Sequence, residues 1–588
     1  MADEQSIGRR SRLFWLIEPM LFLLLAVAST WPLASQIDDA IPNGRERVAT
    51  VPLFNLWTVW WNADRAEEGF ANYWNAPIFA PVENAFALAE TQPTTAVVAP
   101  VVWTSESRAL AYNLYLLTTL VANGWAGSIL VRGLTNNRFV GICGGAALLL
   151  LPFVHWQLGV LQLAQLSGIL LTLHFLIRFL TDYRMQDALL AGVATGFCYL
   201  SCNYYGYQLC LTLLFALPVL LAKRCNVRRL ATGGAVSVVV ASTIILPIAL
   251  TQLSTSSRHG WDRRAETVSR LSAVQDDYFR TLWRGPLSNS GNKKARFPLS
   301  PGLACSTLAV IGAVVGLRRK DTRRVTLFLL LFLVVAAQLS LGPRWVILGQ
   351  RPFEHLVEWL PGLSAMRSPH RFAALVQVSC VLLASLSIAH ANSEEAVDER
   401  SATGKFMAIS PALLPAKWRR AIQWGLVALF CGVLIESWPE QPGLYSMPEY
   451  DQQRPWIEWL RTETQPDDIV ANLPFPGGRS VSDYQDTTVS MLWSTYHKRR
   501  LANGYSGFFP KEFVRLKSDV QNFPDDKSVV ELRMAGVRWC VVDVDKLKSA
   551  NVDMLRDQTL LSLQFETGDG KTRIYKIEPP AEFDWKFD

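Results

Sequence analysis

The sequence predicts an α-helical membrane protein with about eleven transmembrane helices, followed by a soluble α/β domain at its C-terminal end. Half of the 588 residues are hydrophobic, only 18% are charged, and the mean hydropathy is +0.17. Apolar runs recur along the chain, and many of the 21 tryptophans stand near the ends of these runs. Such runs and such aromatic belts are typical of multi-pass membrane proteins.

Each apolar run is judged by length, because a membrane-crossing helix needs about 20 mainly apolar residues. The first run is interpreted as an uncleaved helix, since it is long for the apolar part of a signal peptide. The segment 138–180 fits two tilted helices or one span with a re-entrant piece. The predicted spans are 14–34, 109–133, 138–158, 160–180, 187–205, 206–223, 229–252, 301–317, 325–342, 371–391 and 419–436.

Basic residues in the short loops predict the orientation of the chain. With the N-terminus inside, the inner loops read RGLTNNR, RFLTDYR, KRCNVRR and RRKDTRR, followed by the polar segment 392–418. Cytoplasmic loops of membrane proteins carry such an excess of lysine and arginine. We therefore expect a multi-pass protein of the bacterial inner membrane, with a cytoplasmic N-terminus and an extracytoplasmic C-terminal domain.

The predicted domains are a membrane domain, 1–436, with outer loops 35–108, 254–300 and 343–370, and an extracytoplasmic α/β domain, 437–588. In the first outer loop, PLFNLWTVWW and APIFAPVENAFALAETQP are too short or too polar to span a membrane. We expect these two stretches to form helices that lie along the membrane interface.

The C-terminal domain is predicted to be α/β because segments typical of strands alternate with segments typical of helices. The stretches DIVANLPF, VRWCVVDV, LLSLQFETG and TRIYKIEP are rich in β-branched and aromatic residues and predict strands. The segments 451–461, 510–522 and 526–535 predict helices, whereas FPGG and NGYSG predict turns. His497 is either structural or contacts a substrate.

Composition and motifs exclude several classes. The nine cysteines form no CxxC pair, so neither a disulfide framework nor a zinc finger is expected. The net charge of +7 falls largely in short loops, which points to membrane topology and not to a nucleic-acid partner. G-x-S-x-G, Walker A and H-E-x-x-H motifs are absent from the sequence.

Two basic segments are candidates for phosphate binding. The loop 254–300 has nine basic and four acidic residues, Arg263 and Arg264 among them. In SAMRSPHRFAAL, Arg367, His370 and Arg371 precede a predicted span, where helix N–H groups favour an anion. The alternatives are a tolerated solvated loop for the first segment, and headgroup contact or loop capping for the second.

Carboxylates of the first outer loop are candidates for a general base, which must reach an acceptor hydroxyl. Asp38 and Asp39 follow the first span directly, and the alternative for this pair is an ordinary polar boundary at a helix exit. Glu46 and Glu90 are further candidates, and Glu90 interrupts an otherwise apolar segment. The loop also contains Asp64 and Glu83.

The chain resembles the GT-C class of integral-membrane glycosyltransferases, in particular uncharacterised bacterial members. The resemblance rests on VPLFNLWTVWWNADR, AYNLYLLTTLVANGWAG, SAMRSPHRF and NGYSGFFP, and on an acidic first outer loop before many spans. It implies a polyprenyl-phosphate-linked sugar as donor and a first-loop acid as base or metal-associated carboxylate. Asp38 and Asp39 match that acid best.

The first-loop region also departs from the GT-C pattern. Many relatives have an aspartate shortly before the Trp-rich helix, whereas VATVPLFNLW has no acid here. Either Glu46 substitutes for that aspartate or the activity is absent. The resemblance leaves open whether a divalent metal ion is a cofactor.

These observations give two hypotheses for the function. The first is a membrane glycosyltransferase that transfers a sugar from a polyprenyl-phosphate donor to an extracytoplasmic glycan, lipid or protein acceptor. The second is a non-catalytic membrane protein that binds or translocates a lipid or glycan. Membrane lipids are expected partners in both.

Overall fold

The computed structural model describes residues 17–220, 226–260, 263–279, 297–391 and 416–578. The chain divides into two compact units. The helical unit consists of 1–35, 116–247 and 262–442, and the mixed unit of 36–115, 248–261 and 443–588. The sequence-based domains placed the first outer loop with the membrane spans, whereas this division groups it with the C-terminal segment.

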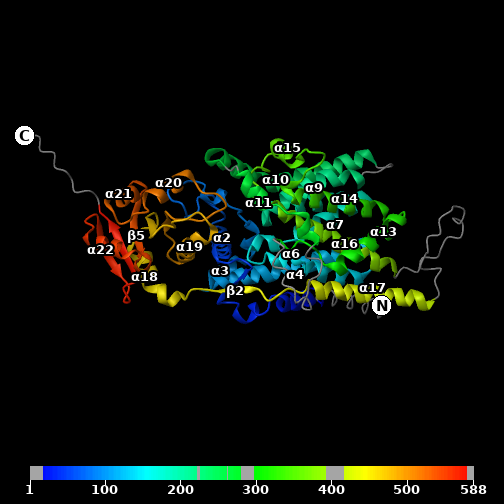
Figure 1. The fold of residues 1–588 in the computed structure, drawn as a ribbon, viewed down its shortest axis with the longest axis horizontal. Coiled ribbons are helices and arrows are strands. Elements are labelled where there is room, and N and C mark those ends of the chain that lie inside the picture. Colours follow the sequence, from blue (N-terminus) through cyan, green and yellow to red (C-terminus); the bar gives the residue numbers. More distant parts are fainter. Residues whose placement is uncertain (1–16, 221–225, 261–262, 280–296, 392–415, 579–588) are drawn as a thin grey trace, which may run out of the picture. The chain divides into compact units, whose positions relative to one another are not determined.

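Helices make up the helical unit (Figure 1). Those that pack against one another include α13 with α16, α7 with α8, and α14 with α16. The helices that lie wholly or mostly in this unit are Ile17–Ser29, α4 Arg108–Thr135, α5 Arg138–Leu149, α6 Pro152–Trp156, α7 Ser167–Asp182, α8 Met185–Ser201, α9 Asn203–Ala216, α10 Val227–His259, α11 Ala265–Arg270, α12 Gln275–Phe279, α13 Leu303–Arg318, α14 Arg323–Ser340, α15 Pro352–Trp359, α16 Ala373–Ala391 and α17 Ala416–Ser437.

The helices confirm an integral membrane protein. In the described part of the chain, six helical segments are long and apolar enough to cross a membrane, and three shorter apolar helices accompany them. Every predicted span contains helical residues, but the count of eleven is not confirmed. The segment 138–180 is broken, because α5 ends at Leu149 and Pro152 starts a new short helix.

The mixed unit contains a five-stranded sheet in the order β4-β3-β5-β7-β6. Strand β3 pairs in parallel with β4 and β5, while β7 pairs antiparallel with β5 and β6. All four predicted strands and all three predicted helices of this region are confirmed. The strands are β3 Ile469–Leu473, β4 Arg500–Leu501, β5 Val537–Asp543, β6 Leu561–Glu566 and β7 Thr572–Ile577. The helices are α18 Tyr450–Glu463, α19 Gln485–His497, α20 Lys511–Asp519, α21 Asp526–Met534 and α22 Ser549–Asp557.

Backbone hydrogen bonds join the first outer loop to the C-terminal segment inside the mixed unit. Strand β1, Ala40–Gly44, pairs antiparallel with β2, Gly443–Ser446. Farther along, the Ala80 N–H donates to the carbonyl of Leu501 at 2.8 Å, and the Leu501 N–H donates to that of Pro77 at 3.0 Å. Residues 77–80 therefore extend the edge of the sheet beyond β4.

The two apolar stretches of the first loop do not form the expected interfacial helices. The first is a helix, α2 Thr50–Glu67, but 50 and 52–64 are all buried, so it is a core helix of the mixed unit. An interfacial helix would keep one polar face exposed. The second stretch forms turns and the short 3-10 helix Ala85–Leu88, because Pro77, Pro81 and positive φ angles interrupt it.

His497 is structural. It lies at the end of α19 with no exposed surface, and its Nδ1 accepts the Arg499 N–H at 3.0 Å. Burial, and to a smaller extent the charge of Arg499, lowers the pKa of His497 to about 3. The folded protein therefore holds this imidazole neutral at pH values where an unfolded chain protonates it.

We expect the mixed unit to lose stability as the pH falls from 7 to 5. An unfolded histidine has a pKa of about 6.5, so below that pH only the unfolded state binds the proton, which costs about 2 kcal/mol by pH 5. The difference in unfolding free energy between the wild type and His497→Gln, measured at both pH values in the full chain, isolates this contribution. An unchanged difference would show that His497 is protonated in the folded state.

Candidate functional site

We call Arg367, His370 and Arg371, in the helical unit, the basic cluster, and Arg371 is its central residue. It lies in the 3-10 turn Pro369–Phe372, which leads into α16, and only 8% of its surface is exposed. Its guanidinium stands over the ring of Tyr204, with 4.6 Å from Cζ to the ring centroid. The Tyr204 hydroxyl in turn accepts the backbone N–H of Arg367 at 3.1 Å. Tyr204, on α9, thus contacts both arginines, and the sequence analysis did not identify it.

His370 is held in an aromatic cage and does not point into solvent. Its ring stacks on Phe297, with centroids 4.2 Å apart and planes at 3°, and meets Trp156 edge-on at 6.0 Å. Its Nδ1 lies 2.8 Å from the carbonyl of Leu271, which fixes an N–H at that nitrogen. With 4% exposed, His370 positions the turn that presents Arg371.

The two basic segments predicted from the sequence lie side by side. The Arg263 N–H donates to the carbonyl of Ser364 at 3.3 Å, and His370 N–H donates to that of Leu271 at 3.3 Å. The segment 263–271 therefore runs along 364–370. Arg263 is half-buried and Arg264 is exposed at the start of α11. The remaining basic residues of this loop at 280–296 fall outside the described residues.

No carboxylate neutralises the central arginines within the described ranges. The ion pairs recorded there include neither Arg367 nor Arg371. The Nε of Arg371 is buried and has no hydrogen-bond partner among these residues. Removing a charge from water is costly unless it is paired, so a buried, unpaired guanidinium favours an anion from outside the chain.

The first-loop acids lie in the mixed unit, in different settings. Asp38 and Asp39 are exposed just before β1, and Glu46 is half-buried between β1 and α2. Backbone contacts fix the aspartates, because the carbonyl of Asp38 accepts from Ser107 Oγ and that of Asp39 from the Met447 N–H. Their carboxylates face solvent, as the polar-boundary interpretation expects.

Glu90 lies beside a buried polar cluster, which makes its setting different. Thr91, Gln92 and Asn55 are each 1% exposed or less, and Gln92 Nε2 donates to Asn55 Oδ1 at 3.0 Å. Thr91 Oγ1, Gln92 Oε1 and Asn55 Nδ2 lack partners in the described part of the chain. Gln92 also has φ +46, a strained left-handed conformation. Unpaired buried groups and backbone strain both concentrate at functional sites.

Asp64 is a buried acid with a structural explanation. It lies near the end of α2, and its carboxylate accepts from Arg65 Nη2 at 2.5 Å and from Lys498 Nζ at 3.1 Å. Lys498 belongs to the C-terminal segment, so this ion pair joins the segment to the first loop. Two cations thus neutralise the carboxylate of Asp64.

A metal site would need several of the described acids and histidines to lie close together. Within the described residues, no three His, Cys, Asp or Glu side chains lie close enough together to hold a metal ion.

Solved structures share the fold. The cryo-EM structure of arabinofuranosyltransferase AftD from Mycobacteria is 14% identical with a TM-score of 0.55, over 97% of this chain and 40% of that chain. A structure of an AftD mutant gives a TM-score of 0.57, again with 14% identity, over 97% of this chain and 42% of that chain. The chain thus spans about two fifths of the length of AftD and shares its fold over that part.

Other likenesses are weaker. ArnT from Cupriavidus metallidurans in the apo state is 12% identical with a TM-score of 0.48, over 96% of this chain and 98% of that chain. No protein-family model and no curated protein matches the sequence.

The two roles of Tyr204 can be separated by substitution. Tyr204→Phe removes the hydroxyl that accepts the Arg367 N–H, and we expect a loss of about 0.5–1.5 kcal/mol of stability. Tyr204→Leu also removes the ring beneath Arg371, for a further ~0.5–2 kcal/mol. Unfolding of the purified protein in denaturing detergent measures both values. Equal losses for the two variants would contradict a stabilising contact between the ring and the guanidinium.

Proposed function

We propose that the protein is a glycosyltransferase that takes a sugar from a polyprenyl-phosphate donor and transfers it to an extracytoplasmic acceptor. The observation that carries the proposal is Arg371, a buried guanidinium on an aromatic ring without a carboxylate partner among the described residues. The fold shared with AftD supports a reaction of this general kind.

The basic cluster is suited to the phosphate of the donor. Arginine presents a planar fork of N–H groups that matches phosphate oxygens, and the turn before α16 adds the positive end of a helix dipole. As the bond from the anomeric carbon to the phosphate oxygen breaks, negative charge grows on the leaving phosphate. Arg371 would stabilise that charge, with Arg367 and Arg263 as further cations and Arg264 as an exposed one.

A first-loop carboxylate would accept the proton of the acceptor hydroxyl as that oxygen attacks the anomeric carbon. Of Asp38, Asp39, Glu46 and Glu90, we favour Glu90. The aspartates are exposed to water, whereas Glu90 is half-buried and adjoins Thr91 and Gln92, whose buried polar atoms could hold substrate hydroxyls or water. Because Glu90 is partly enclosed, less water reaches its carboxylate to compete with the acceptor hydroxyl.

Activity of purified variants tests these roles. With a polyprenyl-phosphate sugar and a glycan, lipid or protein acceptor, we expect Glu90→Gln to lower kcat by about 10²–10⁴-fold. Arg371→Leu should lower kcat/KM by about 10²–10³-fold, with partial recovery in Arg371→Lys. The controls are Glu83→Gln in the same loop and Arg324→Leu at the start of α14, both exposed side chains that should keep full activity.

The same assay distinguishes the two hypotheses. Donor binding that depends on Arg371, with no turnover in the presence of any acceptor class, would favour the non-catalytic lipid- or glycan-binding protein. Activity that survives in Glu90→Gln but is lost in Asp38→Asn, Asp39→Asn or Glu46→Gln would assign the base to that other residue. Wild-type activity in Arg371→Leu would refute the phosphate site.

The reaction also requires the basic cluster to face the outside. We expect Arg270→Cys, exposed at the end of α11, to react with a membrane-impermeant maleimide on intact spheroplasts. Arg324→Cys, exposed in a predicted inner loop, should react only after the membrane is opened. The reverse pattern would place the cluster in the cytoplasm and overturn the proposed orientation.

A further inference from the structure

A small hairpin between α14 and α16 exposes apolar side chains. Ile347 and Gln350 form an isolated antiparallel bridge, with backbone hydrogen bonds of 3.0 and 2.8 Å. The turn residues Leu348 and Gly349 have φ +49 and +80, as in a type I′ turn. Val346 is 55% exposed, Ile347 49% and Leu348 98%. We call residues 345–350 the apolar hairpin.

In water, both the side-chain exposure and the backbone conformation of Leu348 would be energetically unfavourable. Its side chain is almost fully exposed, although burying leucine is favourable. Its backbone adopts a left-handed conformation that glycine, asparagine and aspartate tolerate, but that is strained for a branched apolar residue. A turn made for water would have asparagine or aspartate at this position.

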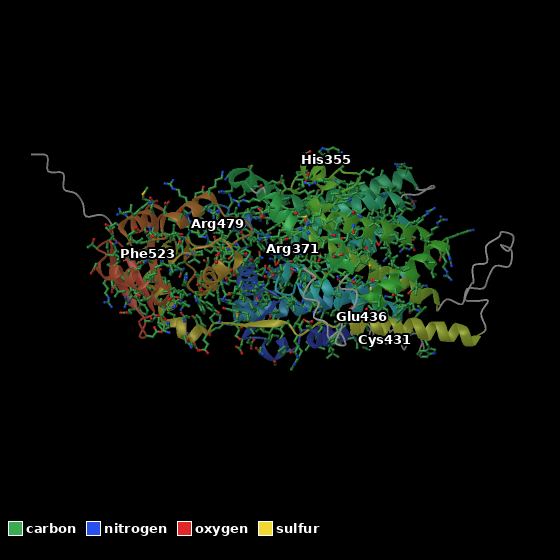
Figure 2. All side chains as sticks on the ribbon, viewed as in Figure 1. His355, Arg371, Cys431, Glu436, Arg479 and Phe523 are labelled. Atoms are coloured by element: carbon green, nitrogen blue, oxygen red, sulfur yellow. The ribbon has the colours of Figure 1, made fainter. Side chains whose placement is uncertain are left out.

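The residues that follow show a second exposed apolar group. Helix α15 buries Phe353 but ends at Trp359, which is 77% exposed. The side chains of Glu354, His355 and Glu358 are exposed along the helix. Figure 2 shows His355 at the rim of its unit, whereas the buried Arg371 lies within it. Exposed tryptophans are typical of the boundary between lipid headgroups and acyl chains.

We propose that the apolar hairpin inserts into the lipid leaflet at which α14 ends, with Trp359 at headgroup level. Helix α14 is a candidate membrane span that ends at Ser340, eight residues before Leu348. An extended chain of that length reaches at most roughly 26–29 Å, so the tip stays within reach of the membrane surface. Val346, Ile347 and Leu348 then continue the lipid-facing surface of a span into the loop.

The chemistry favours lipid over a protein partner. Three consecutive exposed apolar side chains on a narrow turn fit between acyl chains, whereas a protein interface needs a broad complementary surface. The cations Arg344 and Arg351 flank the hairpin, and Arg351 also pairs with Glu354 at 3.0 Å. Guanidinium groups on either side of an inserted apolar tip lie where lipid phosphates are.

Insertion of the hairpin would affect how a lipid substrate reaches the protein. This consequence rests on the proposed function, whereas the insertion itself does not. The chain after α15 leads within a few residues to Arg367 and Arg371, and the Tyr207 hydroxyl donates to the carbonyl of Pro361 at 3.2 Å on the way. A hairpin seated in the leaflet would hold this segment at headgroup depth, where the phosphate of a membrane lipid lies.

Depth-dependent quenching tests the insertion without any assay of transfer. Cys143, Cys210, Cys225 and Cys431 are first changed to serine, since the remaining five native cysteines are buried. Leu348→Cys is then labelled with bimane, and the full chain is reconstituted in phosphatidylcholine vesicles. We expect strong loss of fluorescence with acyl-chain-brominated lipid and little loss with aqueous iodide.

The matched control is Met534→Cys in the same background. Met534 is 76% exposed, is apolar, and lies on α21 of the mixed unit, so its label should be quenched by iodide and not by brominated lipid. A Leu348→Cys label that behaves like the control would overturn the proposal. So would a label shielded from both quenchers, because a protein would then cover the hairpin. Neither result would bear on whether the protein transfers sugars.

Discussion

The mixed unit depends on hydrogen bonds between backbone segments that are far apart in the chain. Strand β1 pairs with β2, which lies about 400 residues later in the chain, and residues 77–80 pair along the edge of β4. Between these pairings, Lys498 reaches Asp64 on α2, and Gln252 Nε2 donates to the carbonyl of Ala89. The loop that contains Glu90 is therefore held by two other parts of the sequence, the C-terminal segment and the end of α10.

This construction explains why the first-loop acids differ in character. Asp38 and Asp39 lie next to β1, where the pairing with β2 fixes the backbone and leaves the side chains in solvent. Glu90 follows a segment enclosed by residues of the C-terminal region, since the Phe508 N–H donates to the carbonyl of Leu88 at 3.2 Å. Pairing with the C-terminal segment thus leaves Asp38 and Asp39 in solvent and gives Glu90 a partly enclosed setting.

The helical unit shows a different arrangement, a cation supported by aromatic rings. Tyr204 beneath Arg371, and Phe297 and Trp156 around His370, contribute ring faces and edges but no negative charge. A carboxylate partner would stabilise the empty protein and would also compete with an anionic ligand. Aromatic support holds the guanidinium in place without engaging its N–H groups, as the proposed phosphate site requires.

Local sequence patterns were sufficient to predict the helices and strands, but not which of them pack or pair with one another. Alternating β-branched residues predicted β3, β5, β6 and β7, and apolar runs predicted the membrane helices, because both signals depend on near neighbours. The burial of α2 was missed, since its tryptophans fit a membrane interface as well as a protein core. Tyr204 was missed because its contact with Arg371 joins residues 167 positions apart, within apolar runs that offer no signal for a pair. The short strands β1, β2 and β4 form only through long-range pairing.

The interleaving of the mixed unit has a consequence for biogenesis. At about 5–20 residues per second, a ribosome needs roughly 25–95 s to synthesise residues 116–588 after it has completed the first segment of this unit. For most of that interval, α2 with Trp57, Trp60 and Trp61 lacks α19, the C-terminal helix that packs against it. The nascent chain therefore carries this tryptophan-rich helix for tens of seconds without the helix that finally packs against it.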